Sequence, residues 1–375
     1  MRILHLHSSF DPGGKELRAA RLINAFGYTV AHSIVSAKPG ALGAASAIDP
    51  SISVYYPDTF PTLNGRPLPK RLRRIAEAMR GYDLILTYNW GAMDAVMAHS
   101  LFGKIFDLPP LVHHEDGFNE DEAKGLKRSR NWFRRIALAR TSGLVVPSTI
   151  LEKIALEAWQ QPAWRVHRIA NGIDMRGLGG KVRRDALPRV IKREGEFWLG
   201  TLAGLRKVKN LPRLVRAFAS LPEEWQLVIL GEGPEREAIR AEAMRLDLSH
   251  RVHMPGFVPD PAKAAALFDL FALSSDSEQF PISVVEAMAS GLAVVSPAVG
   301  DVAAMVAEEN LPFVVPAGND GALADALCAL ADDPALRRSV GQANRKRARA
   351  DYDEKRMIDA YRALYGGVLG SKQFP

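Results

Sequence analysis

The sequence has almost no cysteine, since Cys328 is the single one among 375 residues. One thiol excludes an internal disulfide framework and a metal site built from several cysteines. Low cysteine usage is typical of cytoplasmic proteins. Cys328 itself lies in an Ala- and Leu-rich stretch that predicts a helix, and we expect it to be a small core residue.

Long apolar runs are also missing. No stretch approaches the roughly 18 uninterrupted apolar residues of a membrane-spanning helix. The apolar start of the chain reaches His5 and His7 too soon for the apolar region of a signal peptide. With 47% hydrophobic and 24% charged residues, the composition is that of a soluble globular protein. We therefore expect a cytoplasmic location and no spanning helix.

Several catalytic motifs are absent. The sequence contains no His-Glu-x-x-His, no Gly-Lys-Ser/Thr loop and no Gly-x-Ser-x-Gly elbow, which argues against zinc hydrolysis, P-loop chemistry and acyl transfer. Gly231-Glu-Gly233 lacks the third glycine of a dinucleotide-binding fingerprint and follows the second strand of its predicted sheet, which disfavours an NAD enzyme.

Positive charge is concentrated in the first half of the chain. Residues 1–190 hold 27 Lys+Arg and 17 Asp+Glu, a balance of +10, whereas residues 191–375 hold 22 and 25, a balance of −3. Such an imbalance suits nucleic acid, an anionic membrane surface or a phosphorylated ligand, and a solvated basic face explains it equally well.

Short apolar runs alternate with amphipathic stretches along the whole chain, which predicts α/β structure with buried parallel strands. This alternation occurs once in each half of the chain, so we expect two domains. The expected strands are 3–6, 82–87, 111–113 and 143–146 in the first half, and 197–202, 226–230, 251–254, 270–273, 293–296 and 313–315 in the second.

A glycine-rich and charged segment separates the two halves. We expect an N-terminal domain over 1–176, a linker over 177–194 and a C-terminal domain over 195–352, with a last helix over about 353–368 that packs back on the first domain. Ligands of open parallel sheets bind beyond the carboxyl ends of the strands, so the chemistry is sought in a cleft between two such domains.

The most informative stretch follows the predicted strand 270–273 and contains two carboxylates, Glu278 and Glu286. Pro281 suits the start of a helix and Gly291 its end, so a helix is predicted over about 281–290. Free backbone amides at its start favour a diphosphate, and carboxylates accept hydrogen bonds from sugar hydroxyls. For two isolated glutamates the more common explanation is a helix-start acid and a solvated or ion-paired residue.

This stretch resembles the Glu-seven-residues-Glu signature of family 4 glycosyltransferases, and the resemblance extends through most of the chain. Gly13 and Gly14 follow the first strand where that family has a glycine-rich loop, although such a pair is often only a turn. Lys209 matches the phosphate-binding lysine of the family. Gly204 stands where the family has an arginine, and we expect Arg206 to substitute for it. Fixed cations there would stabilise the charge of a leaving nucleoside diphosphate.

On the acceptor side, Asp116 stands where many related transferases have a histidine. We expect either Asp116 or His114 to form the hydrogen bond to the sugar's primary hydroxyl that the family's histidine makes, and a histidine with a structural hydrogen bond is the alternative for His114. The resemblance implies catalytic roles for Asp116, His114, Arg206, Lys209 and Glu278, and donor contacts from Gly13, Gly14, Arg206, Lys209, Gly256, Phe257, Val258, Glu278, Phe280, Pro281, Ile282, Ser283 and Glu286. Gly300 and Asp301 are a further candidate contact.

Two basic stretches of the first half, 70–74 and 124–135, carry apolar and aromatic residues among their charges. A basic helix that exposes Trp132 and Phe133 would settle at an anionic bilayer, and a solvated helix with its aromatics in the core is the alternative. Asp351 and Asp353 have the Asp-x-Asp spacing that some glycosyltransferases use for a metal. Their place before a predicted helix favours a cap, so we expect no essential metal and no cofactor.

The resemblance implies the GT-B fold, two Rossmann-like α/β domains, and a retaining glycosyltransferase. Its expected partners are a nucleotide-diphosphate sugar, a glycan or lipid-linked acceptor and, peripherally, an anionic membrane at the cytoplasmic face, in the synthesis of surface polysaccharide or glycolipid. A monomer or dimer without nucleic acid is expected. The alternatives are a nucleotide-sugar epimerase or hydrolase on the same fold, and a basic protein that binds nucleic acid or membrane.

Overall fold

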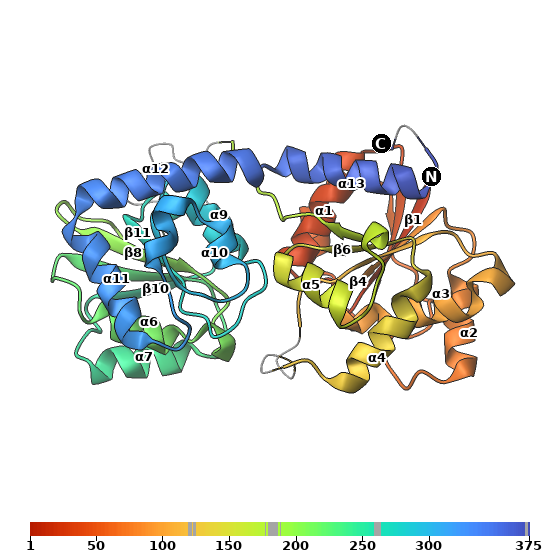
Figure 1. Ribbon diagram of the computed structural model, residues 1–375, viewed down its shortest axis with the longest axis horizontal. Coiled ribbons are helices and arrows are strands. Elements are labelled where there is room, and N and C mark those ends of the chain that lie inside the picture. The colour runs from red at the N-terminus through yellow and green to blue at the C-terminus, as the bar shows by residue number, and fades with distance from the viewer. Residues whose placement is uncertain are drawn as a thin grey trace. The chain divides into compact units, whose positions relative to one another are not determined.

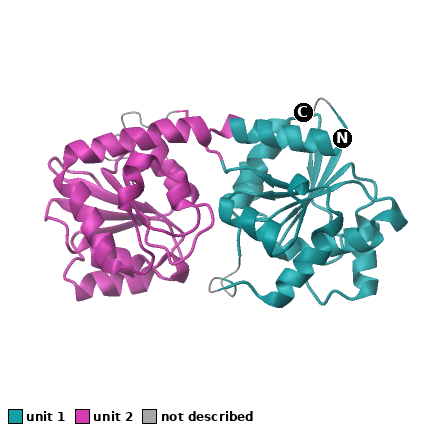
Figure 2. Ribbon diagram, viewed as in Figure 1, with its two compact units in different colours: residues 1–171, 356–375 teal, residues 172–355 magenta. Residues whose placement is uncertain are grey.

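The computed structural model describes the chain except residues 119–121, 123–124, 177, 179–186, 188, 259–263 and 372–373. The chain divides into two compact units (Figure 2), the first formed by Met1–Asn171 with Arg356–Pro375 and the second by Gly172–Lys355. It therefore passes between the units twice, after Asn171 and within the last helix. The segment expected as a linker, 177–194, belongs to the second unit in this division and lies mostly outside the described residues.

The first unit is built on a parallel sheet in the order β3-β2-β1-β4-β5-β6-β7. The direction of strand succession reverses between β1 and β4, which is where open α/β sheets bind ligands. The strands are β1 (Arg2–His7), β2 (Ala31–Ser36), β3 (Val54–Tyr55), β4 (Leu84–Tyr88), β5 (Leu111–His114), β6 (Gly143–Val146) and β7 (Val166–Arg168).

Alternating side chains of this sheet enter two separate cores. Leu4 and Leu6 of β1 pack in a core with α2, α3, α4 and α5, whereas Ile3 of the same strand packs with α1 and α13 on the other face (Figure 1). Strands buried on both faces read as continuous apolar runs, which is why the sequence predicts them. The helices are α1 (Gly14–Phe26), α2 (Pro69–Ala78), α3 (Met93–Phe106), α4 (Arg128–Ala137), α5 (Thr149–Glu157) and α13 (Glu354–Val368).

Three strands of this sheet were not expected, namely β2, β3 and β7. The sequence of β2, Ala-His-Ser-Ile-Val-Ser, is too polar for a buried strand by pattern alone. In the fold the ring of His32 is buried and shares a hydrogen bond of 2.9 Å with the ring of His5 on the neighbouring β1. The polar side chain is therefore satisfied inside the sheet, which the local sequence could not reveal.

The second unit repeats the architecture, with a parallel sheet in the order β10-β9-β8-β11-β12-β13 whose strand succession reverses between β8 and β11. All six of its expected strands are present, with ends shifted by at most two residues. They are β8 (Phe197–Leu202), β9 (Trp225–Leu230), β10 (Val252–Gly256), β11 (Leu270–Ala272), β12 (Val294–Pro297) and β13 (Val314–Val315).

One face of this second sheet packs in a core with α6, α7 and α11, and α12 packs against α9. The helix predicted over 281–290 is observed as α9, with Pro281 as its N-cap residue and Gly291 in a left-handed conformation just past its end. The helices of the unit are α6 (Leu211–Phe218), α7 (Arg236–Arg245), α9 (Ile282–Ala289), α10 (Val302–Met305), α11 (Asp320–Asp332) and α12 (Pro334–Asp351).

Candidate functional site

Lys209 and Glu278 meet at the carboxyl edge of the second sheet. Lys209 follows β8 and Glu278 follows β11, and these two strands are direct neighbours at the point where the strand order reverses. The Nζ atom of Lys209 lies 2.5 Å from Oε1 of Glu278, and the Ser275 hydroxyl donates to the same oxygen at 2.6 Å. The side chains are only 14% and 11% exposed. The fold thus brings together two predicted site residues that are 69 positions apart.

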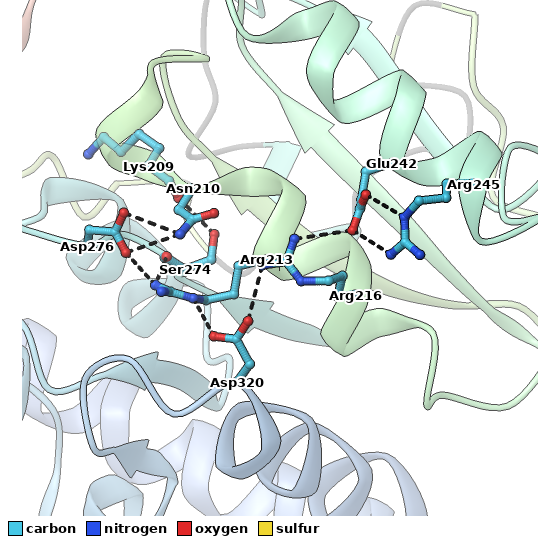
Figure 3. A network of polar contacts seen from close by, with 9 residues as sticks. All are labelled: Lys209, Asn210, Arg213, Arg216, Glu242, Arg245, Ser274, Asp276 and Asp320. Atoms are coloured by element: carbon cyan, nitrogen blue, oxygen red, sulfur yellow. Dashed lines mark hydrogen bonds and ion pairs between the residues drawn. The ribbon is translucent and has the colours of Figure 1, made fainter.

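A polar network holds the loop that carries Lys209 (Figure 3). The hydroxyl of Ser274 donates to the Lys209 carbonyl at 2.9 Å, and Asn210 donates to the Asp276 carboxylate. Arg213 of α6 donates to the same carboxylate at 2.7 Å and to the Ser274 carbonyl at 3.1 Å. Figure 3 draws no contact between the Lys209 amine and Asp276. The network therefore fixes the lysine backbone and leaves its amine for Glu278.

Arg213 and Asp276 are site-supporting residues that the sequence reasoning missed. Arg213 also donates to the Asp320 carboxylate at 2.7 Å, so it connects the loops after β8 and β11 to the start of α11. Asp276 lies two positions before Glu278 in the stretch that carried the prediction. An arginine one turn after the lysine loop was the available signal, but only the fold shows its partner.

Helix α9 begins four residues after Glu278. Its N-cap residue is Pro281, which offers no side-chain acceptor for the first amides of the helix at Ile282 and Ser283. Glu286 is half-buried and lies one turn further along the helix, close to the face of Ile282 and Ser283. This arrangement can accept an anion at the helix start with a carboxylate on either side.

Gly300 supports the Glu278 loop through its backbone. Its φ is +54°, and a Cβ atom there would lie 2.7 Å from the carbonyl oxygens of both Glu278 and Gln279. The amide of Asp301 donates to the Gln279 carbonyl at 3.0 Å. The expected contact of Gly300 and Asp301 with a sugar or phosphate stays a prediction. In the structure their backbone contacts the Glu278 loop, and only a glycine permits that approach at position 300.

The remaining predicted donor residues of the second unit lie on loops at the same sheet edge. Arg206 is exposed and caps the short turn Lys207–Lys209. Gly256 ends β10 with a φ of +101°, and its carbonyl accepts from the Gly231 amide at 3.0 Å. The ring of Phe257 is 69% exposed, and Val258 is half-buried. Phe280 packs edge-to-face on Tyr352 at 5.6 Å, so its ring is fixed by the end of α12.

In the first unit, Gly13 is the N-cap residue of α1 and Gly14 begins the helix. Gly13 is extended, with φ of −162°, so its conformation does not require glycine. A Cβ atom there would, however, lie 2.7 Å from Oε2 of Glu16. Glu16 also pairs with Lys15. Burial lowers the pKa of Lys15 to about 8, although Asp116 acts in the opposite direction.

Asp116 lies two residues after the end of β5 and is held by Arg18 of α1. Both guanidinium nitrogens of Arg18 contact the two carboxylate oxygens, one of them at 2.8 Å. Arg18 also donates to Asn171 at 2.7 Å. Burial alone would raise the pKa of Asp116, but the charge and hydrogen bonds of Arg18 outweigh it and hold the pKa below 3.8. Such a carboxylate is a hydrogen-bond acceptor rather than a strong base.

His114 is placed differently from what an acceptor-site role requires. Its ring is 1% exposed, Nδ1 lies 3.1 Å from the Thr87 carbonyl and Nε2 lies 2.8 Å from the Tyr365 hydroxyl. A carbonyl only accepts, so Nδ1 carries the proton and Nε2 accepts from Tyr365. Burial lowers the pKa of His114 to about 3. The geometry therefore favours the structural alternative for His114 and leaves Asp116 as the acceptor-side candidate.

The basic stretch that ends in α4 divides its aromatics between two environments. Trp132 is 61% exposed, whereas Phe133 packs edge-to-face on Trp90 at 5.7 Å. Arg134, which the sequence reasoning grouped with the surface charges, is fully buried and lies 3.1 Å from the Glu122 carboxylate. Lys124 of this stretch lies outside the described residues. In the other stretch, Arg73 is exposed and pairs with Glu77.

Asp351 and Asp353 have separate partners. Asp353 precedes α13 and accepts from the Lys355 amide at 2.8 Å, as a helix cap does, and Asp351 lies 3.5 Å from Arg347. No group of three or more metal-ligating side chains occurs among the described residues. Within the same part of the chain, no helix is long and apolar enough to cross a bilayer. Cys328 is a half-buried free thiol.

Each half of the chain matches a known protein family. Residues 12–176 match the family described as glycosyltransferase family 4, and residues 183–347 match glycosyl transferases group 1. The N-acetyl-alpha-D-glucosaminyl L-malate synthase of Bacillus anthracis is 28% identical over 47% of each chain. The N-acetylgalactosamine-N,N'-diacetylbacillosaminyl-diphospho-undecaprenol 4-alpha-N-acetylgalactosaminyltransferase of Campylobacter jejuni is 29% identical over 52% of each. The chain thus spans about half the length of these relatives.

Among solved structures, HepE of Anabaena in complex with UDP and glucose superposes with a TM-score of 0.80 at 21% identity, covering 98% of this chain and all of that one. This likeness establishes the fold, which is that of the GT-B glycosyltransferases, with two parallel-sheet α/β domains. Two successive family matches, one for each half, agree with it. The chain belongs to the family 4 (group 1) glycosyltransferases.

Proposed function

We propose that the protein is a retaining glycosyltransferase that moves a sugar from a nucleotide-diphosphate donor to a glycan or lipid-linked acceptor. The proposed sugar is a hexose. The single observation that carries the proposal is the contact of Lys209 with Glu278 at the strand-order reversal of the second sheet. A lysine for the phosphate and a carboxylate for the sugar hydroxyls lie there beside the start of α9, which favours an anion.

The proposed reaction breaks the bond between the anomeric carbon and the donor phosphate, whose oxygen keeps the electron pair. The acceptor hydroxyl attacks the same face of the sugar, and its proton passes to the leaving phosphate. Lys209, with Arg206 as the second cation, stabilises the charge that develops on the diphosphate. Glu278 holds the sugar, Glu286 holds the ribose, and Asp116 accepts a hydrogen bond from the transferred sugar. These groups position the two substrates and stabilise the charge of the leaving diphosphate.

The relatives support the wider setting. The names of the curated relatives include an acceptor on diphospho-undecaprenol and lipopolysaccharide core biosynthesis, and HepE was solved with UDP and with UDP-glucose. We propose by analogy a role in surface polysaccharide or glycolipid synthesis, in the cytoplasm and at the inner face of the membrane when the acceptor is a lipid. No essential metal is proposed, so addition of EDTA should leave the transfer rate unchanged.

Thermal-shift measurements with UDP, GDP and other nucleoside diphosphates test the donor site. At least one nucleotide should raise the melting temperature. Substitution of Lys209 by Ala or Glu278 by Ala should then remove most of that shift and cut transfer about 10²- to 10³-fold. Because the two side chains are paired and mostly buried, each single change should also lower stability, and the double variant Lys209→Met/Glu278→Gln should recover part of it.

Lys207→Ala is the matched control, because Lys207 lies on the same turn and is exposed. It should keep both nucleotide binding and transfer. The central claim fails if no nucleoside diphosphate stabilises the protein, or if Lys207→Ala is as damaging as Lys209→Ala. With donor alone, release of free sugar faster than transfer would indicate a hydrolase, and sugar interconversion an epimerase. The anomeric configuration of the product, measured by NMR, tests retention.

A further inference from the structure

Arg134 of α4 is a fully buried cation with two carboxylate partners. Its side chain is 0% exposed, and its guanidinium donates to both oxygens of Glu122, at 3.1 and 3.2 Å. Its Nε atom lies 3.3 Å from Oε2 of Glu115. Three aromatic rings lie 4.8 to 5.2 Å from the guanidinium carbon, those of Trp90, Phe118 and Trp159. An arginine is rarely buried to this extent unless its charge is paired.

Stability alone does not account for this cluster. Removing charges from water costs free energy that their attraction often fails to return, and apolar side chains of similar size stabilise a protein as well or better. Arg130 also donates to Glu122, at 3.0 Å, so two arginines balance the charges of the two glutamates. What such a cluster can supply is a fixed geometry, because the planar guanidinium fork constrains the direction of each carboxylate.

Glu115 depends on Arg134 for its placement. Its amide donates to the Val145 carbonyl of β6 at 3.0 Å, which continues the extended direction of β5. Both oxygens of its carboxylate are buried and have no hydrogen bond among the described residues. The ring of His113 lies 3.9 Å away, further than the Arg134 guanidinium. The ion pair with Arg134 is therefore the main contact of the Glu115 side chain.

Asp116 is the next residue after Glu115, and successive side chains of an extended chain point to opposite faces of a sheet. Glu115 accordingly contacts Arg134 of α4, and Asp116 contacts Arg18 of α1 at 2.8 Å. The two helices belong to the cores on opposite faces of the sheet. Two arginines thus hold neighbouring carboxylates from opposite sides, although residues 115–118 belong to no helix or strand.

We propose that Arg134 is a positioning residue, which fixes Glu115 and thereby holds the Asp116 carboxylate against Arg18, in the orientation that contacts the transferred sugar. This role rests on the proposed function, which gives Asp116 that contact. Arg134 is buried and acts only through its neighbours. A displacement of about 1 Å at a reacting group can lower a rate about 10²-fold, so a residue behind the site can control turnover.

Titration of the Asp116 carboxyl group, followed by NMR with isotope-labelled aspartate, reports its placement directly. Burial raises the pKa of Asp116, but the charge of Arg18 outweighs it, and His114 and Lys15 act in the same direction as Arg18. Arg134→Lys keeps the buried charge and loses the fork. The contact between Asp116 and Arg18 should loosen, and the pKa of Asp116 should therefore rise toward 3.8.

Arg165→Lys is the matched control. Arg165 is 9% exposed in the same compact unit, stacks over the ring of Trp164 at 4.7 Å and donates to Gln161 at 2.9 Å. The variant makes the same exchange at a buried arginine that does not contact Glu115. It should leave the pKa of Asp116 unchanged.

A second variant, Arg134→Met/Glu115→Gln, covers the case in which Arg134→Lys does not fold. It removes one charge of each sign and leaves Glu122 paired with Arg130. It should raise the pKa of Asp116 in the same way, because the contact that fixes position 115 is gone.

Turnover tests whether Arg134 acts through Asp116. The measured rate is the release of nucleoside diphosphate from the donor with water as the acceptor, so the natural acceptor is not needed. Arg134→Lys should lower this rate about tenfold and keep the thermal shift with nucleotide, because Lys209 and Glu278 belong to the other compact unit. In an Asp116→Asn background the same change should lower the rate less than about twofold, because the group that it positions is already altered.

The proposal is wrong if Arg134→Lys folds and leaves the pKa of Asp116 unchanged, or if Arg165→Lys raises that pKa equally. It is also wrong if the rate losses of Arg134→Lys and Asp116→Asn multiply, since the two residues would then act independently. Full turnover of Asp116→Asn would instead contradict the contact that the proposed function gives to Asp116. A raised pKa of Asp116 in Arg134→Lys would, even then, show that Arg134 places this carboxylate.

Discussion

At the scale of single residues, the candidate acceptor-side residue Asp116 depends on its pairing with Arg18. Both side chains are almost fully buried, at 3% and 14% exposure. A buried charge without its partner is far less stable than the pair. The sequence singled out Asp116, but the arginine that holds it lies 98 positions away. Only the fold assigns that partner.

Arg18→Met should lower the free energy of unfolding by about 3–5 kcal/mol, because it leaves the Asp116 carboxylate buried and unpaired. Urea unfolding followed by circular dichroism measures this loss. The double variant Arg18→Met/Asp116→Asn should recover part of it, because no charge remains to be paired. Equal stability of the single and double variants would show that the pair has no such coupling.

The same pair predicts a dependence on pH. Arg18 holds the pKa of Asp116 below its unfolded value of 3.8, so the folded protein binds the proton less readily than the unfolded chain. The stabilisation is therefore complete above about pH 5 and is lost as the pH falls through the folded pKa. The free energy of unfolding, measured between pH 3 and 7, should fall less steeply toward pH 3 for Asp116→Asn than for the unchanged protein.

At the scale of elements, the candidate donor site depends on loops that support one another at one sheet edge. The turn after β8 carries Lys209, the loop after β11 carries Glu278, and the loop after β12 contacts the latter through Gly300. The α9 helix was predictable because proline and glycine mark its two ends. The contacts between loops were not, because Lys209 and Glu278 lie far apart in the chain and the contact at Gly300 is made with backbone oxygens.

Gly300→Ala should displace the Glu278 loop. A Cβ atom would lie 2.7 Å from two carbonyl oxygens, and the φ of +54° disfavours alanine in addition. We expect a cost of about 1–3 kcal/mol together with weaker nucleotide binding, measured by thermal shift with and without donor. Gly318→Ala is the control, because Gly318 has a φ of +79° and no atom within 4 Å of an added Cβ. It should lose some stability and keep nucleotide affinity; equal loss of nucleotide affinity in both variants would contradict the role of the close contact.

At the scale of the whole molecule, each compact unit contains its own sheet and its own apolar core. Units with separate cores need not unfold in one step. Calorimetry should therefore resolve two transitions. If the donor site lies in the second unit, UDP or another binding nucleotide should raise only one of them, by about 2.7 kcal/mol at a hundredfold excess over Kd.

Lys209→Ala identifies the transition that belongs to the donor site, because its ligand-induced shift should disappear there. Arg18→Met provides the complementary marker, since it should lower the other transition. A single transition that moves with nucleotide as a whole would mean that the two units unfold together. Two transitions that both rise equally with nucleotide would contradict a donor site confined to the second unit.

The sequence by itself determined the α/β class and ten of the strands, because buried parallel strands are apolar runs. It also singled out Lys209, Glu278 and Asp116 after the carboxyl ends of strands, and their roles stay predictions. The sequence did not predict polar buried strands such as β2, since their side-chain hydrogen bonds are made to distant residues.

The tertiary structure decided which polar groups pair. It buried the neutral ring of His114 and joined Lys209 to Glu278. On helix α4 it buried Arg134 and left Trp132 exposed. Each of these outcomes depends on contacts between residues far apart in the chain. Local sequence sets the type of side chain, and only the packing of the elements sets its partner and its exposure.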